Sequence, residues 1–313
     1  MKNMIFSAEN LIGNTPLIQL KKTQEAFGLE CNLFAKVEGF NVGGSIKSRV
    51  AKAILDDAEK SGKLQKGGTV VEATSGNTGI GLALVASLRG YKAIIVMPDT
   101  MSKERQTLIK AYGGEVVLTD GKLGMKGALE KAEEICKNTP NSMIAGQFSN
   151  PANVQAHYQG TAPELYQQMQ GNIDLFVAGV GTGGTLTGVG RYLKERGACQ
   201  VIAVEPSASP LLSKGVAGPH KLQGIGANFI PEILDREVYD EVIAVSDEEA
   251  YRWARYLSKE EGLFVGISSG AAFAAALQAA KRSENKGKNL VVILPDEGGR
   301  YLSTDLFEDE ICK

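Results

Sequence analysis

The sequence predicts an α/β protein made of two three-layer domains, each built on a mostly parallel, twisted sheet. Two observations carry this prediction. Short β-branched apolar runs alternate with helical patterns, and a chain of 313 residues that is 43% hydrophobic can bury a large core. Repeated strand–helix–strand order places helices on both faces of a parallel sheet. At roughly 150 residues per domain, we expect domains over residues 1–149 and 150–313.

The expected strands are short apolar runs rich in β-branched residues. They are Leu33–Val37, Thr69–Ala73, Lys92–Met97, Glu115–Thr119, Met143–Ala145, Leu175–Gly179, Val201–Val204, Val242–Val245 and Leu290–Leu294. The expected helices lie between them: Ile46–Ser61, Asn77–Arg89, Lys103–Ala111, Lys126–Lys137, Thr161–Met169, Gly184–Arg196, Asp247–Glu260 and Ser269–Lys281. Open α/β sheets bind ligands at the carboxyl ends of their strands, so the loops that follow strands are the candidate sites.

Composition excludes several classes of function. The net charge is −2, so no basic excess attracts nucleic acid or an anionic membrane. No C-x-x-C pair and only two histidines occur, which argues against a metal site. The N-terminal residues lack an apolar run long enough for a signal peptide, so we expect none, and the sequence has no apolar run of about 20 residues that could span a membrane. We therefore expect a cytoplasmic protein whose four cysteines, Cys31, Cys136, Cys199 and Cys312, are reduced.

A glycine-dense loop, Gly179–Thr185, joins an expected strand to an expected helix. Backbone N–H groups at a helix start form an anion site, and glycine lets the anion approach closely. Thr182 and Thr185 add hydroxyl donors. Two alternatives stay open on these residues alone. One is a tight turn without a ligand. The other is the dinucleotide site of a nicotinamide-dependent dehydrogenase, because the loop satisfies G-x-G-x-x-G and Glu205 ends the next strand.

A second loop after a strand, Glu72–Gly79, is rich in hydroxyl groups. Thr74, Ser75 and Thr78 surround Gly76, and helix-start amides together with hydroxyls suit a carboxylate. In the same loop, the Asn77 amide suits a phenolic oxygen. The alternative is that a Ser or Thr of this loop only caps the helix that follows.

Lys47 lies one turn into an expected helix, after the flexible turn Gly43–Ser45. A lysine in such a place is usually a solvated surface residue, and the residue alone leaves this alternative open. A lysine held near helix N-termini and desolvated would instead have a lowered pKa, and it could act as nucleophile and base.

The three loops, in this order, resemble the cysteine synthase (O-acetylserine sulfhydrylase) family of fold-type-II pyridoxal-phosphate (PLP) enzymes. Further segments match the family pattern: Gly13–Leu17, Gln147–Ala152, Gly218–Lys221, Gln223–Ala227, Gly266–Ala271, Leu294–Pro295 and Arg300–Thr304. The match runs over residues 10–306, nearly the whole chain. The resemblance implies a fold like that of the tryptophan synthase β-subunit, and it implies that the glycine loop holds a single phosphate.

The resemblance implies a role for each matching site residue. Lys47 is expected to hold PLP as a Schiff base and to act as the catalytic base. The expected cofactor contacts are Gly181, Thr182, Gly183, Gly184 and Thr185 at the phosphate, Asn77 at the ring hydroxyl and Ser268 at the pyridine nitrogen. The expected substrate contacts are Thr74, Ser75, Thr78 and Gln147 at the α-carboxylate, Gly76 beside them, and Gly224 and Asn228 on a loop near the substrate.

The implied reaction is a β-replacement. O-acetyl-L-serine loses acetate to give a bound α-aminoacrylate, and sulfide adds to it to form L-cysteine. The neutral hydroxyl of Ser268 makes a weaker electron sink than an aspartate would, which favours β-elimination over transamination. The resemblance also implies a homodimer, small amino-acid substrates, and docking of the C-terminal tail of serine acetyltransferase.

One departure from the family pattern bears on the substrate. Asn228 stands where the family usually has a second glycine. Its amide could alter the choice of leaving group or nucleophile, so that the enzyme consumes cysteine, releases hydrogen sulfide and makes serine, lanthionine or cystathionine. Alternatively, asparagine only tolerates the left-handed backbone that glycine would supply, with no effect on the chemistry.

Overall fold

The computed structural model describes residues 5–308, which form two compact units. The first unit contains the chain up to Gly13 and Asn41–Ala156, and the second contains Asn14–Phe40 and the chain from His157 onward. Each unit is therefore assembled from two separate stretches of chain. The expected domain boundary between residues 149 and 150 stays a prediction; the compact units themselves change over after residues 13, 40 and 156.

The first unit is built on a four-stranded parallel sheet in the order β5-β4-β3-β6. These strands are β3 (Thr69–Ala73), β4 (Lys92–Pro98), β5 (Glu115–Thr119) and β6 (Ser142–Ile144). The helices of the unit are α2 (Lys47–Lys60), α3 (Asn77–Arg89), α4 (Lys103–Ala111), α5 (Gly124–Asn138) and α6 (Ala152–Ala156). A 3-10 turn, η1 (Ala8–Leu11), precedes them.

Neighbouring residues of β3 point to opposite faces of this sheet, as the strand period of two requires. Val70 packs in one core with α2 and α3, whereas Val71 packs in another with Ala128 and Ala132 of α5. Both faces of the sheet are thus covered by helices. The first unit accordingly has the three layers that the sequence predicts.

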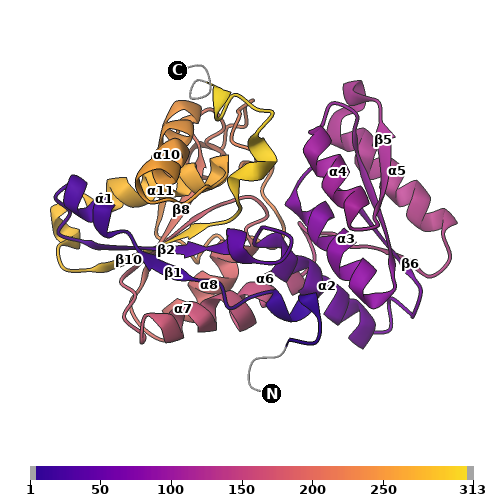
Figure 1. Cartoon of the computed structure of the whole chain (residues 1–313), viewed down its shortest axis with the longest axis horizontal. Coiled ribbons are helices and arrows are strands. Elements are labelled where there is room, and N and C mark those ends of the chain that lie inside the picture. Colours follow the sequence, from indigo (N-terminus) through magenta and orange to yellow (C-terminus); the bar gives the residue numbers. More distant parts are fainter. Residues whose placement is uncertain (1–4, 309–313) are drawn as a thin grey trace. The chain divides into compact units, whose positions relative to one another are not determined.

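The second unit contains a six-stranded sheet in the order β1-β2-β10-β7-β8-β9. Its strands are β1 (Leu17–Gln19), β2 (Asn32–Val37), β7 (Leu175–Gly179), β8 (Gln200–Pro206), β9 (Glu241–Val245) and β10 (Asn289–Leu294). Only the pairing of β1 with β2 is antiparallel among the described strand pairs. Figure 1 shows α10 and α11 on one side of this sheet and α7 and α8 on the other.

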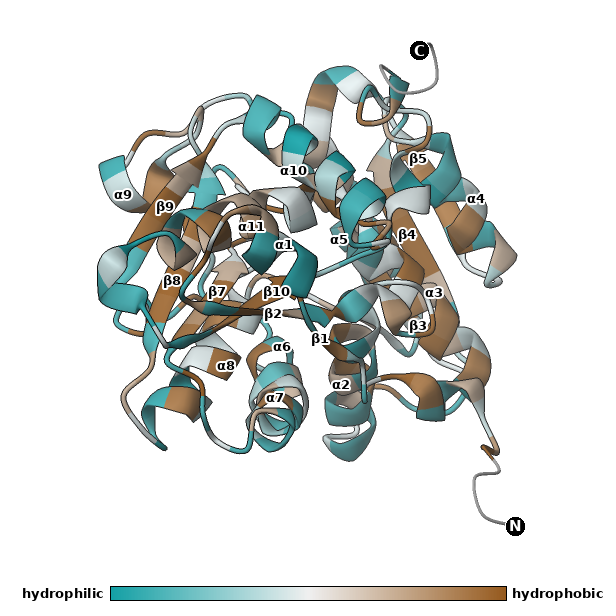
Figure 2. Cartoon of the chain, turned by 60° about the vertical axis from the view of Figure 1, so that its left-hand side comes forward, coloured by the Kyte–Doolittle hydropathy of each residue, from teal (hydrophilic) through white to brown (hydrophobic). Residues whose placement is uncertain are grey.

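The helices of the second unit are α1 (Lys21–Ala26), α7 (Ala162–Gln168), α8 (Gly184–Lys194), α9 (Leu211–Lys214), α10 (Asp247–Glu260) and α11 (Ile267–Ala280). Helix α11 is almost entirely buried, and its alanines pack with Trp253 of α10 and with the strands. A π-helical turn, His157–Thr161, joins α6 to α7. Figure 2 shows the apolar strands in brown and the teal, polar surfaces of α1 and α10.

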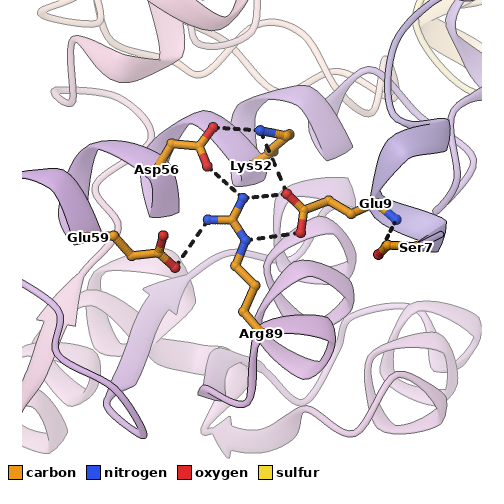
Figure 3. A network of polar contacts seen from close by, with 6 residues as sticks. All are labelled: Ser7, Glu9, Lys52, Asp56, Glu59 and Arg89. Atoms are coloured by element: carbon orange, nitrogen blue, oxygen red, sulfur yellow. Dashed lines mark hydrogen bonds and ion pairs between the residues drawn. The ribbon is translucent and has the colours of Figure 1, made fainter.

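A network of ion pairs ties the N-terminal turn of the first unit to two of its helices (Figure 3). Arg89, at the end of α3, donates to Glu9 of η1 and to Asp56 of α2, the latter at 2.6 Å. The Arg89 guanidinium also lies 3.2 Å from Glu59 of α2, and Lys52 reaches both Glu9 and Asp56. Because Arg89 is largely buried, the network fixes the C-terminal ends of α2 and α3 against each other.

The predicted fold class is confirmed, and every predicted strand and helix is present with ends within two residues. Strand β1, the short helices α1, α6 and α9 and the π-helical turn were not predicted. Within the described residues, no helix is both long and apolar enough to cross a membrane. Cys31, Cys136 and Cys199 are free thiols, and Cys312 lies outside the described residues.

Candidate functional site

The predicted site residues fall into two groups, one in each compact unit. The group of the first unit is Lys47, Thr74, Ser75, Gly76, Asn77, Thr78 and Gln147. The group of the second unit is Gly181, Thr182, Gly183, Gly184, Thr185, Gly224, Asn228 and Ser268. We call residues 74–78 the hydroxyl loop and residues 181–185 the glycine loop.

Lys47 is the first residue of α2 and follows a turn in which Gly43 and Gly44 have positive φ angles of 86° and 70°. The hydroxyl of Ser45 accepts a hydrogen bond from the Lys47 amide at 3.3 Å. The first turn of α2 packs closely on α3, because a Cβ on Gly81 would lie only 2.8 Å from the carbonyl oxygen of Lys47. A glycine in α3 therefore lets the lysine approach the helix that the hydroxyl loop begins.

Burial lowers the pKa of the Lys47 ammonium group from its usual value to about 8. The carboxylate of Glu72, near the end of β3, acts in the opposite direction and raises the pKa of Lys47. Lys47 is also half-buried in the structure, so it is not the solvated surface lysine of the sequence alternative. An amine with this pKa is partly neutral near pH 7, so it can act as a nucleophile or a base.

The hydroxyl loop connects β3 directly to α3. Gly76 is the N-cap residue of α3, and no side chain caps the helix, so the capping alternative is not what the structure shows. The hydroxyl of Thr74 accepts a hydrogen bond from the Gly76 amide at 3.2 Å, and the guanidinium of Arg105 in α4 donates to the carbonyl oxygen of Ser75 at 3.4 Å. The amides of the first turn of α3 thus lie beside hydroxyl groups, an arrangement that suits a carboxylate.

Gln147 lies next to the hydroxyl loop, although about 70 residues separate them in sequence. The Thr78 hydroxyl donates to Oε1 of Gln147 at 2.6 Å, and both side chains are buried. Asn153 of α6 donates from Nδ2 to the carbonyl oxygen of Gln147 at 2.8 Å. The structure therefore brings together two residues that sequence analysis assigns to the same carboxylate.

Glu72 is a buried residue of this group to which sequence analysis assigned no role. Its carboxylate accepts the N–H groups of Gly146 at 2.8 Å and Gln147 at 3.3 Å. Burial raises the pKa of the Glu72 carboxyl to about 7, although these hydrogen bonds, the Gln147 side chain and the charge of Lys47 lower it. The sequence does contain a signal, because an acidic residue inside a continuously buried parallel strand needs buried partners.

The glycine loop is built by close packing. Gly183 is the N-cap of α8 with a φ of 83°, and no side chain caps this helix either. A Cβ on Gly181 would overlap the carbonyl oxygen of Gly224, and a Cβ on Gly183 would lie 2.8 Å from the Leu234 side chain. The Thr185 hydroxyl lies 3.3 Å from Nε2 of His157 in the π-helical turn. Only glycine fits at positions 181 and 183, and the backbone amides of the helix start are therefore left to bind an anion.

Gly224 lies between Gly181 and Ser268 and packs closely against both. Gly224 has a φ of 99°, and a Cβ on it would lie 3.2 Å from Oγ of Ser268. Ser268 is a buried residue in the first turn of α11. The amide of Gly226 donates to the carbonyl oxygen of Val180 at 3.0 Å, which joins the segment around Gly224 to the end of β7.

Asn228 has a left-handed backbone with a φ of 61°. Its Oδ1 accepts a hydrogen bond from the Ser209 hydroxyl at 2.8 Å, and Oγ of Ser209 also accepts the amide of Gly218 at 3.1 Å. The side chain is exposed and bonded within its own unit. These contacts match the alternative in which asparagine supplies a left-handed residue in place of glycine.

Glu205, the acidic residue of the possible dinucleotide fingerprint, is buried and already bonded. Its carboxylate accepts the amides of Leu212 at 2.7 Å and Ser213 at 3.2 Å, and it also accepts the Ser213 hydroxyl. In a dinucleotide site this carboxylate would bind the ribose hydroxyls. These contacts instead fix α9 to the end of β8, which argues against the dehydrogenase alternative.

The chain matches, over residues 8–296, the family model described as pyridoxal-phosphate dependent enzyme. A cysteine synthase of Staphylococcus aureus is 51% identical over 299 residues, which are 95% of each chain.

Two solved structures are similar along nearly the whole chain. A cysteine synthase (OASS) of Entamoeba histolytica has a TM-score of 0.95 and 43% identity, over 98% of this chain and 92% of that one. A hydrogen sulfide-producing enzyme of Fusobacterium nucleatum has a TM-score of 0.91 and 44% identity, over 96% and 100% of the two chains.

Proposed function

We propose, from the premise that this chain belongs to the family of pyridoxal-phosphate dependent enzymes, that it is a cysteine synthase. It forms L-cysteine and acetate from O-acetyl-L-serine and sulfide. The observation that carries this proposal is Lys47, an amine of lowered pKa in the same unit as the hydroxyl loop and its uncapped helix start. The 51% identity to a cysteine synthase over 95% of both chains supports the choice of substrates.

The residues present fit the cofactor, which carries an aldehyde, a phosphate, a phenolic oxygen and a pyridine nitrogen. Lys47 offers an amine for the aldehyde, and the glycine loop offers helix-start amides for the phosphate. Asn77, the first residue of α3, offers an amide for the phenolic oxygen, and Ser268 offers a neutral hydroxyl for the pyridine nitrogen. Each cofactor group therefore has a chemically suitable protein group.

Lys47 is the proposed general base. When bound, the cofactor supplies an electron sink for the charge that remains on the substrate α-carbon after its proton has left. Nζ of Lys47 takes that proton, which requires the neutral amine, and later returns it to the product. The pKa of about 8 gives Nζ a basicity close to the working pH, where a general base is most effective.

Ser268 and the hydroxyl loop are proposed to direct this reactivity. The Ser268 hydroxyl carries no charge, so it does not favour a protonated ring nitrogen, and the weaker sink favours loss of the β-substituent. Thr74, Ser75, Gly76, Thr78 and Gln147 hold the substrate α-carboxylate. A fixed carboxylate orients the α-proton toward Lys47.

A second candidate function is the consumption of cysteine with release of hydrogen sulfide. The similarity to the hydrogen sulfide-producing enzyme of Fusobacterium nucleatum favours it. We give cysteine synthesis precedence because Asn228, the residue that suggested altered chemistry, is bonded to Ser209. The decisive comparison is the rate of cysteine formation from O-acetyl-L-serine and sulfide against the rate of sulfide release from L-cysteine.

We further propose that the enzyme acts in the cytoplasm as a homodimer, and that the segment around Gly224 and Asn228 lies near the bound substrate. The C-terminal tail of serine acetyltransferase is the proposed protein partner. Family resemblance supports these assignments. Light scattering tests the dimer, and competition between a peptide of that tail and O-acetyl-L-serine tests the partner.

Replacement of Lys47 tests the proposed function. The wild-type protein loaded with pyridoxal phosphate should absorb visible light and form cysteine, measured by a colorimetric thiol assay after removal of sulfide. Lys47→Ala should lose this activity and the visible band together, because no other residue of the group carries an amine. Full activity in Lys47→Ala, or no cysteine formation by the wild type, would refute the proposal.

A further inference from the structure

We propose that Glu72 is a positioning residue that orients the Gln147 side chain for the substrate carboxylate. The inference rests on the part of the proposed function that assigns Thr78 and Gln147 to this carboxylate. It goes beyond that function because it names the group that orients the Gln147 amide so that it can donate to the substrate carboxylate. Glu72 is 3% exposed and lies one residue before the end of β3, next to the start of the hydroxyl loop.

The backbone that carries Gln147 is held by Glu72. The amides of Gly146 and Gln147 donate to different oxygens of the carboxylate, Oε2 at 2.8 Å and Oε1 at 3.3 Å. Gly146 has a φ of 66°, so the chain turns sharply at this point. The turn is also bonded on its carbonyl side, because Asn150 donates from Nδ2 to the carbonyl oxygen of Ala145 at 3.0 Å. Glu72 is therefore the acceptor that fixes this turn.

The Oε1 end of the Gln147 amide is held in place, because it accepts the Thr78 hydroxyl at 2.6 Å. The Glu72 carboxylate accepts the backbone amide of the same residue at 3.3 Å, and the Gln147 side chain lowers the pKa of the Glu72 carboxyl. Above its pKa of about 7 the Glu72 carboxyl is ionised and only accepts, so it selects the orientation in which Nε2 of Gln147 points toward it. Nε2 carries two hydrogens, and the second one is the donor that remains for a substrate carboxylate.

Glutamine at position 72 would no longer favour one orientation of the Gln147 amide. Its amide has one acceptor oxygen, whereas Gly146 and Gln147 need two acceptors. Its NH2 group would face one of these backbone donors, and it could also reverse the Gln147 amide. Aspartate would keep the charge and both acceptor oxygens, although it is one methylene shorter.

The test is an absorption titration of the pyridoxal-phosphate-loaded protein with L-serine and with L-serine methyl ester, which lacks the charged carboxylate. Glu72→Gln should weaken L-serine binding at least about tenfold and change ester binding by less than about twofold. Glu72→Asp should retain L-serine binding within about threefold. Glu205→Gln is the matched control, because Glu205 is also a buried strand carboxylate that accepts two consecutive amides, and it should leave both affinities unchanged.

A double-mutant cycle separates orientation of Gln147 from general damage. In a Gln147→Ala background, Glu72→Gln should cause almost no further loss of L-serine affinity, because the residue it orients is absent. The inference is overturned if Glu72→Gln binds L-serine like the wild type, if it weakens the ester equally, or if the two losses add. Should Glu72→Gln not fold, Glu72→Asp decides, and a loss of L-serine affinity well above threefold that the ester shares overturns the inference.

Failure of the proposed function gives a different result. A wild-type protein that binds L-serine but forms no cysteine from O-acetyl-L-serine and sulfide would refute the synthase assignment alone. The titration would still report whether Glu72 acts through Gln147.

Discussion

The hydroxyl loop of the first unit and the glycine loop of the second both join a parallel strand to a helix without a side-chain cap. They differ in how tightly their glycines are packed. The nearest atom to a Cβ on Gly76 would be Thr74 Oγ1 at 3.8 Å, whereas a Cβ on Gly181 would overlap the backbone of Gly224. The hydroxyl loop thus presents side chains around open space, whereas the glycine positions of the glycine loop present backbone that its neighbours hold in place.

This difference indicates two ways to bind an anion. A cradle of packed backbone has one shape and cannot adjust, which suits a phosphate that stays bound through many turnovers. Side-chain hydroxyls and the Gln147 amide can change partners, which suits a carboxylate that enters and leaves in every cycle. The four predictions that follow would break or sharpen this comparison, beginning with the largest expected effect.

Gly181→Ala should have the largest effect, because the added methyl group would displace the backbone that forms the cradle. We expect affinity for pyridoxal phosphate to fall about 100-fold, since overpacking of a rigid site costs up to ~3 kcal/mol. Gly76→Ala is the control and should keep cofactor affinity within about threefold. Equilibrium dialysis measures both. Equal losses in the two variants would show that the two loops do not differ in this way.

Thr78→Val should affect the substrate and spare the cofactor. The variant removes the hydroxyl that donates to Oε1 of Gln147, so the KM for O-acetyl-L-serine should rise about tenfold. The position of the visible absorption band should not change. Thr107→Val, which removes an exposed hydroxyl from α4, is the control and should leave KM unaltered. A fall in kcat with constant KM would contradict a role in substrate binding.

The pH dependence of cofactor loading should report the pKa of Lys47. Only the neutral amine attacks the aldehyde, so the loading rate of the cofactor-free protein should rise with pH and level off above about 8. Stopped-flow absorption measures this rate. A lysine with the usual pKa of 10.5 would give a rate that still rises at pH 9.5. Because the Glu72 carboxylate raises the pKa of Lys47, Glu72→Gln should move the midpoint to lower pH.

Replacements of Asn228 should have the smallest effect. Asn228→Ala loses the bond to Ser209 and places alanine at a φ of 61°, so it should destabilise the protein by about 1 kcal/mol. Asn228→Gly loses the same bond but accepts this φ, so its free energy of unfolding should stay close to that of the wild type. Urea denaturation measures both. A changed ratio of cysteine synthesis to sulfide release in Asn228→Gly would restore the chemical interpretation of this residue.

The main strands and helices could be predicted because their apolar patterns are long and local. Strand β1 could not, since Leu17–Gln19 has only three residues and its antiparallel pairing with β2 depends on tertiary structure. The π-helical turn was missed for a similar reason. Its His157 is defined by contacts with Thr161 and Thr185, which no local pattern shows.

The site was predicted less evenly than the fold. The glycine loop and the hydroxyl loop each follow a predicted strand and have an unusual composition, rich in glycine or in hydroxyl residues. Their residues could therefore be chosen from the sequence. The bond between Thr78 and Gln147 and the two amides on Glu72 join residues about 70 positions apart, and sequence spacing does not predict such contacts. Lys47 could be chosen from the sequence as a candidate, but its lowered pKa could not be predicted, because the pKa depends on burial that only the fold creates.

The strand order of the larger sheet has a consequence for the order of synthesis. Strand β2 lies between β1 and β10, yet β10 is made more than 250 residues later. All four strands of the first unit have been synthesised once Ile144 has been made, long before β10, so this unit can fold early. Residues 14–40 must wait for their sheet partner until residues 289–294 emerge, and the second unit is therefore completed last.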